Sequence, residues 1–135
     1  GCGNGNNSTS DAGGRLVGSG SVSVTATSPD LMTLTCNSLV PNKPGLYFQG
    51  NNAVNSGSGN QFGDGLRCAG GGVIRLQVRF ASSTGTSSTN ISIATKGGCA
   101  AGDVKRYQLW YRDPASSPCG ATFNLTNGYE ITWTP

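Results

Sequence analysis

The sequence predicts an all-β domain, an antiparallel β-sandwich of about eight strands with a jelly-roll or immunoglobulin-like topology. Three observations lead to this prediction. Short segments alternate apolar with polar residues, turn residues separate these segments, and no window carries the spacing of an amphipathic helix. Gly, Ser, Thr and Asn make up nearly half of the chain, a composition that suits strands joined by tight turns.

The chain divides into a polar head or linker, residues 1–14, and a sandwich domain, residues 15–135. The head is rich in Gly, Asn and Ser, which is typical of a flexible linker. The domain opens with an alternating segment, residues 15–27, that is predicted to be a strand. This strand either belongs to the domain's own sheet or is donated to a neighbouring subunit. Its apolar members, the expected subunit contacts, are Leu16, Val22, Val24 and Ala26.

Six later segments show strand patterning between turns. They cover residues 32–36, 46–49, 72–80, 90–95, 105–112 and 129–133. Alternate residues of a strand share a face, so the apolar residues of segment 72–80 place Val78 and Phe80 in the core with Leu76. The opposite, water-facing side then carries Arg75, Gln77 and Arg79.

Composition limits the cellular compartment and the classes of partner that we expect for this chain. Charged residues are only 11% of the chain, and the net charge of +3 comes from scattered Lys and Arg. Without a basic run, a nucleic-acid partner is not expected, and without a long apolar run, membrane insertion is not expected. Five cysteines with no Cys-x-x-Cys pair favour disulfides in an oxidising compartment. We therefore expect a secreted, extracellular protein.

The residues that catalysis normally needs are scarce. The chain has no His, the usual acid–base group near neutral pH. Asp64 and Asp113 stand in motif-like settings, but each lies close to an arginine, Arg67 or Arg112. Such pairs favour a structural role as braces between loops. We expect no enzyme activity and no cofactor; calcium bound by Asp64, Asp113 and loop carbonyls is the weaker alternative.

Glycans and sugars offer two further candidate functions. Asn-x-Ser/Thr triplets, the acceptors for N-linked glycans, begin at Asn6, Asn7, Asn90 and Asn124. Aromatic side chains could instead form a sugar-stacking platform, although most of them are expected to fill the core. Trp110 is the exception, because it lies on the opposite face of its strand from Tyr107, Leu109 and Tyr111. It is expected at a contact surface. The platform candidates are Tyr47, Trp110, Tyr111, Tyr129 and Trp133.

Three phrases carry a resemblance: FGDGLRCAGG at residues 62–71, WYRDP at 110–114 and FNLTN at 123–127. In this order, and followed by a final strand, they resemble a domain of secreted bacterial surface proteins of unassigned function. The resemblance covers residues 38–135 and implies export and a β-sandwich, with no known activity. It also places the loops around Cys68 and Cys119 together, which implies a disulfide between them. Cys36–Cys99 is then the second expected pair, and Cys2 is left for a neighbouring subunit.

A polar head followed by a single sandwich domain is also similar in architecture to the subunits of donor-strand extracellular filaments. The favoured expectation is therefore a structural subunit that polymerises head to tail with copies of itself, and that carries glycans. In such a polymer, residues 15–27 would complete the neighbour's open sheet edge. The alternative is a secreted carbohydrate-binding or adhesive module.

Overall fold

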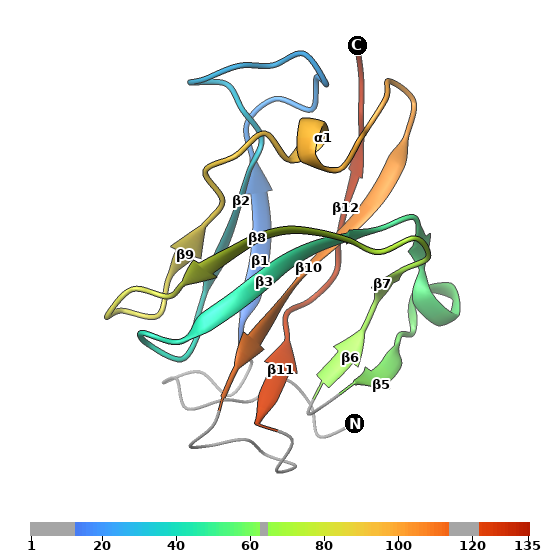
Figure 1. Cartoon of the computed structure of the whole chain (residues 1–135). Helices are drawn as coiled ribbons and strands as arrows, with labels where there is room; N and C mark the ends of the chain where they lie inside the picture. The colour runs from blue at the N-terminus through green and yellow to red at the C-terminus, as the bar shows by residue number, and fades with distance from the viewer. Residues whose placement is uncertain (1–12, 63–64, 114–121) are drawn as a thin grey trace.

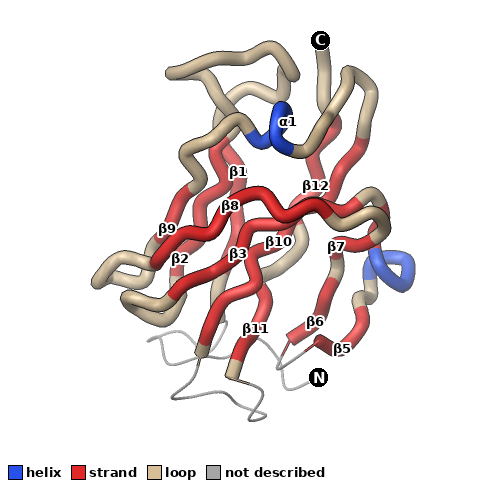
Figure 2. The backbone as a smooth tube through the Cα atoms, in the orientation of Figure 1, coloured by secondary structure: helices blue, strands red, loops and turns tan. Residues whose placement is uncertain are grey.

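The structure, a computed structural model, describes residues 13–62, 65–113 and 122–135. This part of the chain is nearly all β-structure and forms a sandwich of antiparallel sheets, as the sequence predicts (Figures 1 and 2). The strands are β1 (Arg15–Ser19), β2 (Thr33–Asn37), β3 (Pro44–Gly50), β4 (Asn52–Ala53), β5 (Asn60–Phe62), β6 (Gly65–Arg67), β7 (Ala69–Gly70), β8 (Ile74–Phe80), β9 (Ser87–Ser88), β10 (Val104–Arg112), β11 (Phe123–Leu125) and β12 (Tyr129–Thr132). The helical elements are a 3-10 turn, η1 (Val54–Gly57), and one short α-helix, α1 (Ile93–Lys96). The strands outnumber the expected eight because several are only two or three residues long.

Two sheets make the layers of the sandwich. One has the order β1-β2-β9; the other has the order β11-β10-β3-β8, with β12 also paired to β10. Two small pairs, β4-β7 and β5-β6, belong to an excursion between β3 and β8. Figure 1 shows β1 and β2 behind β8 and β3, with α1 towards the end where the C-terminus lies.

The main core fills the space between the two sheets. Leu16 and Leu34 come from one sheet and Tyr47 and Tyr107 from the other, and all four are almost completely buried. Burying such apolar surface is the main stabilising contribution to a fold of this size. The remaining buried members of this cluster are Met32, Cys36, Leu39, Leu76, Ala81, Ile93, Ala94, Leu109, Tyr111, Ile131 and Trp133.

A chain of hydrogen bonds runs through one end of the core. The Trp133 indole Nε1 donates to the Tyr107 hydroxyl at 2.9 Å, and that hydroxyl donates to Gln49 Oε1 at 2.8 Å. Gln49 Nε2 in turn donates to the carbonyl of Gly97 at 3.0 Å, just after α1. Buried polar groups need such partners, so this chain fixes the position of α1 over the strands.

Five predicted strands are confirmed as β2, β3, β8, β10 and β12. The strand predicted over residues 90–95 is wrong, because this segment contains α1. Ser92 is the reason: its side-chain oxygen accepts the backbone N–H of Thr95 at 3.2 Å and caps the helix. Ile93 and Ala94 are buried in the core by the helical turn. Over so few residues, an alternating pattern does not distinguish a helix from a strand.

The predicted facing of β8 is also wrong in its second half. The register with β3 shifts between Tyr47 and Phe48 at a β-bulge, which puts an extra residue into β8. Beyond the bulge the side-chain parity reverses. Val78 and Phe80 therefore point to the outer side of the sheet, 60% and 68% exposed, while Leu76 stays in the core.

The segment predicted as one long strand, residues 15–27, is a strand only as far as Ser19. Gly20 follows with φ +105°, where a side chain would meet the carbonyl oxygen of Leu31. Beyond Gly20 the chain makes only isolated bridges. The expected contact residues are therefore split: Leu16 lies in this chain's own core, Val22 is exposed, and Val24 and Ala26 are half-buried.

The outer edge of β1 is covered by side chains instead of another strand. Asn127 Oδ1 accepts the backbone N–H of Leu16 at 2.8 Å, and Asn127 Nδ2 donates to the carbonyl of Leu16 at 3.0 Å. The Tyr129 hydroxyl donates to the carbonyl of Gly18 at 3.4 Å. One amide side chain thus pairs with both backbone groups of Leu16, as a neighbouring strand would. This arrangement ties β1 to the segment between β11 and β12.

Substituting Asn127 by Asp tests this tie. The carboxylate keeps the shape but replaces the Nδ2 donor by an acceptor that faces the carbonyl of Leu16. We expect Asn127→Asp to lower the free energy of unfolding by about 1–3 kcal/mol, measured by urea denaturation. Asn37→Asp, at an exposed position of β2, is the control and should change stability by less than about 0.5 kcal/mol. Equal stability of the Asn127 variant and the wild type would show that the tie contributes nothing.

Candidate binding surface

The outer face of the five-stranded sheet carries an unusual row of apolar side chains. Trp110 on β10, Leu46 on β3 and Val78 on β8 lie opposite one another in register. Phe80, opposite Pro44, continues this surface towards the end of β8. Large apolar side chains gathered on a sheet face need cover or a partner.

Part of this outer face is covered by the excursion between β3 and β8. Phe62 and Phe123 pack against Trp110, with ring centroids 5.5 and 5.4 Å from that of the indole. Both phenyl rings meet the indole edge to face, at interplanar angles of 73° and 68°, and the two phenyl rings are tilted by 58° to each other. They therefore form a small second core, not a flat stacking platform. Its fully buried members are Phe48, Ala69 and Leu125.

Gln108 attaches this excursion to the sheet. Its side chain is 0% exposed, and its Oε1 accepts the backbone N–H groups of Cys68 and Ala69 at 2.7 and 3.0 Å. Its Nε2 donates to the carbonyls of Leu66 and Thr126 at 2.9 and 2.7 Å. All four hydrogen-bonding positions of the amide are satisfied. One side chain of β10 thus holds both the β6–β7 segment and the end of β11.

Between the excursion and the far end of β8 lies an uncovered hollow, which we call the groove. It consists of two adjoining pockets of about 170 and 270 Å³ that share Leu46 and Trp110 as walls. The first pocket is completed by Phe48, Phe62, Arg67, Val73 and Arg75. The second is completed by Pro44, Gly45, Val78 and Arg112. The groove therefore has an apolar floor and arginines at both ends.

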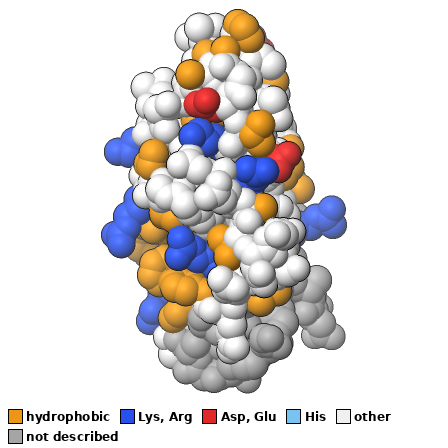
Figure 3. Space-filling view, turned by 90° about the vertical axis from the view of Figure 1, so that its right-hand side faces the viewer, with side chains coloured by type: hydrophobic (Ala, Val, Ile, Leu, Met, Phe, Trp, Pro, Cys, Tyr) orange, Lys and Arg blue, Asp and Glu red, His pale blue; other side chains and the backbone are white. Residues whose placement is uncertain are grey.

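These arginines differ in what they contact. Arg67 Nε donates to the carbonyl of Ala69 at 3.1 Å. Arg75 and Arg112 are exposed, and their side chains have no hydrogen-bond or ion-pair partner among the residues that the structure describes. No Asp or Glu lines either pocket in that part of the chain. Figure 3 shows hydrophobic side chains gathered beside Lys and Arg side chains, with the visible acidic side chains higher on the molecule.

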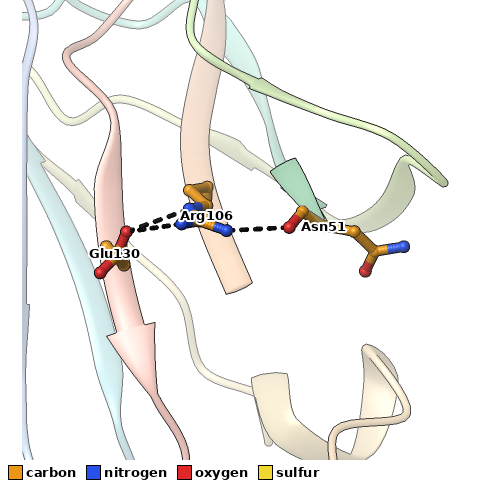
Figure 4. Close-up of polar contacts among 3 residues, drawn as sticks. All are labelled: Asn51, Arg106 and Glu130. Atoms are coloured by element: carbon orange, nitrogen blue, oxygen red, sulfur yellow. Dashed lines mark hydrogen bonds and ion pairs between the residues drawn. The ribbon is translucent and has the colours of Figure 1, made fainter. Parts of the chain in front are cut away.

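Another arginine of β10, Arg106, differs from Arg75 and Arg112 because its side chain is paired. Arg106 lies against Glu130 of β12, with Nε and Nη2 each 3.0 Å from Oε2, and its Nη1 donates to the carbonyl of Asn51 at 2.9 Å (Figure 4). The charge of Arg106 is thus balanced locally. The outer face of β10 therefore presents a paired arginine at one end and, at the groove, an arginine with no partner among the described residues, Arg112.

The predicted Asp64–Arg67 brace stays a prediction, because Asp64 lies outside the described residues. Arg67 Nε itself donates to the carbonyl of Ala69, the first residue of β7. Asp113 is fully buried at the end of β10, and its backbone N–H donates to the carbonyl of Thr122. No hydrogen bond or ion pair joins the side chains of Arg112 and Asp113 in the described part of the chain, because consecutive residues of an extended chain point to opposite sides.

Three of the five cysteines fall in the described residues, and all three are free thiols. The expected Cys36–Cys99 disulfide is therefore not formed. Cys36 is buried on β2 beside Tyr47, whereas the Cys99 thiol donates to Gln49 Oε1 at 3.2 Å. Cys68 is free, and its expected partner Cys119, like Cys2, lies outside the described residues.

The other predicted sites stand as follows. Asn90 is exposed, and its Oδ1 accepts a hydrogen bond from Gln77, so an N-linked glycan has access there. Asn124 is 0% exposed and cannot accept a glycan in the folded chain. Asn6 and Asn7 lie outside the described residues. Calcium stays a prediction, since it depends on Asp64; the described residues contain no cluster of three or more His, Cys, Asp or Glu.

Sequence reasoning found only part of this surface. It placed Trp110 at a contact surface, and the structure puts it half-buried in the wall of the groove. Tyr47, Tyr111 and Trp133 fill the core, as expected. The exposure of Val78 and Phe80 was missed because it depends on a bulge that has no sequence signature here.

Comparisons with protein-family models, with curated protein sequences and with solved structures find no match for this chain. Among the described residues, no helix has the length and apolar character needed to cross a bilayer. The function must therefore be argued from the surface itself.

The buried thiol of Cys36 predicts how stability depends on pH. Loss of hydration raises the pKa of this thiol from its ordinary value of 9.0 to about 12. Above pH 9 the unfolded chain therefore releases a proton that the folded chain retains, so stability falls as the pH rises towards 12. Burial also raises the pKa values of Tyr47 and Tyr107, which adds to this loss above about pH 10.

We expect Cys36→Ala to flatten the decline. Urea unfolding of both proteins in reductant, at several pH values between about 8 and 10, should show a shallower loss of stability in the variant. Only the slopes of stability against pH are compared, because the smaller side chain of the variant also lowers stability by a similar amount at every pH. Identical slopes would contradict the raised pKa of Cys36.

Proposed function

We propose that this chain is a secreted, non-catalytic binding module that contacts its partner through the groove. The observation that carries the proposal is the exposure of Val78 and Phe80 next to Trp110 on a regular sheet face. Exposed apolar patches of this kind mark interaction sites on soluble proteins. The absence of His from the chain supports a role in binding over one in acid–base chemistry.

The geometry favours a protein partner over a sugar. A sugar ring stacks on the flat face of an exposed aromatic ring, but Phe62 and Phe123 pack edge to face on Trp110 and tilted to each other, so that the three rings shield one another. The open part of the surface is instead aliphatic and aromatic side chains with arginines at its ends. Apolar contacts combined with Arg are typical of protein–protein interfaces.

Assembly by strand donation would need a rearrangement of this fold. Leu16 would have to leave the core, and both backbone groups of Leu16 would lose their bonds to Asn127. The groove needs no such change. If the chain does assemble with copies of itself, contact between the groove of one copy and a different surface of the next is the simpler route.

An anionic, apolar dye tests whether the groove accepts ligands. We expect 8-anilinonaphthalene-1-sulfonate to bind the native domain with a rise in fluorescence, and Val78→Asp, at an exposed lining residue of the groove, to abolish most of this signal. Val17→Asp is the matched control, because Val17 is also partly exposed, at 38%, but lies on β1 in the other sheet. Equal signals from all three folded proteins would contradict the proposal.

Sedimentation velocity on the same proteins shows whether the partner is a second copy. Concentration-dependent self-association that Val78→Asp removes would make the module a self-assembling subunit. A monomer at all concentrations would leave a different protein as the partner.

A further inference from the structure

The register of the sheet places three rows of outward side chains along the groove. The first row is Gln108, Phe48 and Arg75, and the second is Trp110, Leu46 and Val78. The third is Pro44 on β3, with Arg112, which follows Tyr111, at the same level of β10; Phe80, opposite Pro44 on β8, lies just outside the groove lining. Along its length the groove thus presents a charged position, then an apolar one, then a second charged one. Successive rows are two residues apart on β3.

From this pattern we propose that the groove binds an extended segment of a partner protein with carboxylates at positions i and i+4 and an apolar residue at i+2. The proposal rests on the proposed function of the groove and adds the identity of the ligand. In an extended chain, residues i, i+2 and i+4 share one face. Their spacing therefore matches the spacing of the rows on the sheet.

The length of the groove along β3 also matches the length of such a segment. The step from Phe48 to Pro44 on β3 is four residues, or about 13 Å at about 3.3 Å per residue. Five extended residues cover the same length. Arg75 and Arg112 stand on opposite sides of β3, and their long side chains reach towards the two carboxylates from either side. The apolar residue lies over the Leu46–Trp110 pair, which both pockets share.

The positive charge of the groove favours an acidic segment as its ligand. Arg75 and Arg112 have no partner in the described part of the chain, and no carboxylate lines the groove there. Two carboxylates would each gain a charge-assisted, planar contact to a guanidinium. A second copy of this chain, meeting groove to groove about a two-fold axis, would instead bring arginines against arginines. A basic segment would be repelled for the same reason.

The test uses three blocked pentapeptides. The ligand peptide is Asp-Thr-Ile-Thr-Glu, the second has the same residues in the order Asp-Glu-Ile-Thr-Thr, and the third is Lys-Thr-Ile-Thr-Lys. Binding is followed by amide and indole chemical shifts in NMR titrations of the full chain. We expect the first peptide to bind weakly, with shifts confined to β3, β8 and the Trp110 indole, and to bind at least about tenfold more tightly than the other two.

Matched arginine variants show whether the groove is responsible. Arg75→Gln/Arg112→Gln should weaken the first peptide's binding by about tenfold or more, whereas Arg15→Gln, at an exposed arginine of β1, should leave it unchanged. Higher salt should weaken binding to the wild type and not to the double variant. No binding, equal binding of the three peptides, or an unchanged double variant would overturn the proposal. If the dye still binds in that case, the groove remains a binding site for a ligand of another kind.

Discussion

The candidate surface depends on one buried amide, that of Gln108. Its side chain lies on the outer face of β10, where a polar group with no access to water would cost free energy unless fully hydrogen-bonded. Four backbone groups from two separate segments supply those bonds. The exchange is reciprocal, because these backbone groups, some buried and some partly buried, gain hydrogen-bond partners in the same amide. Gln108 therefore fixes where the excursion covers the sheet, and so where the groove begins.

A second glutamine has the corresponding role on the inner face. Gln49 of β3 pairs in register with Tyr107 of β10, and its amide bonds the Tyr107 hydroxyl and the carbonyl of Gly97. The two central strands thus carry one buried amide towards each side of the sheet. Each amide attaches an irregular segment, α1 with its following turn or the β6–β7 excursion, to a regular framework. Such fully satisfied polar groups favour a single arrangement over alternatives.

The regular framework was predictable, and the attachments were not. Alternation of Tyr107, Leu109 and Tyr111 identified the core face of β10, and the parity of Trp110 identified its outer face. The same rule failed for Val78 and Phe80, because a bulge adds one residue and reverses the parity. Parity is a local property of the sequence, whereas a bulge is set by pairing between strands far apart in the chain.

The polar attachments escape sequence reasoning for a related physical reason. Nothing in the neighbourhood of Gln108 or Asn127 distinguishes them from exposed residues, since their partners lie far away, with Leu16 separated from Asn127 by 111 positions. Cysteine counting suggested covalent cross-links, but in this structure Cys36 lies buried beside Tyr47 and the Cys99 thiol bonds the amide of Gln49. Amide side chains, not disulfides, connect the described segments to the sheets.

Hydrogen exchange at Cys68 and Ala69 tests the role of Gln108 most directly. Both backbone N–H groups donate to Gln108 Oε1, in a segment with little regular structure of its own. The account predicts that native-state NMR exchange will show these two amides protected as strongly as those of the β3–β10 ladder. In Gln108→Ala they should lose this protection while the ladder keeps it. Fast exchange in the wild type, or unchanged protection in the variant, would show that Gln108 does not hold the excursion on the sheet.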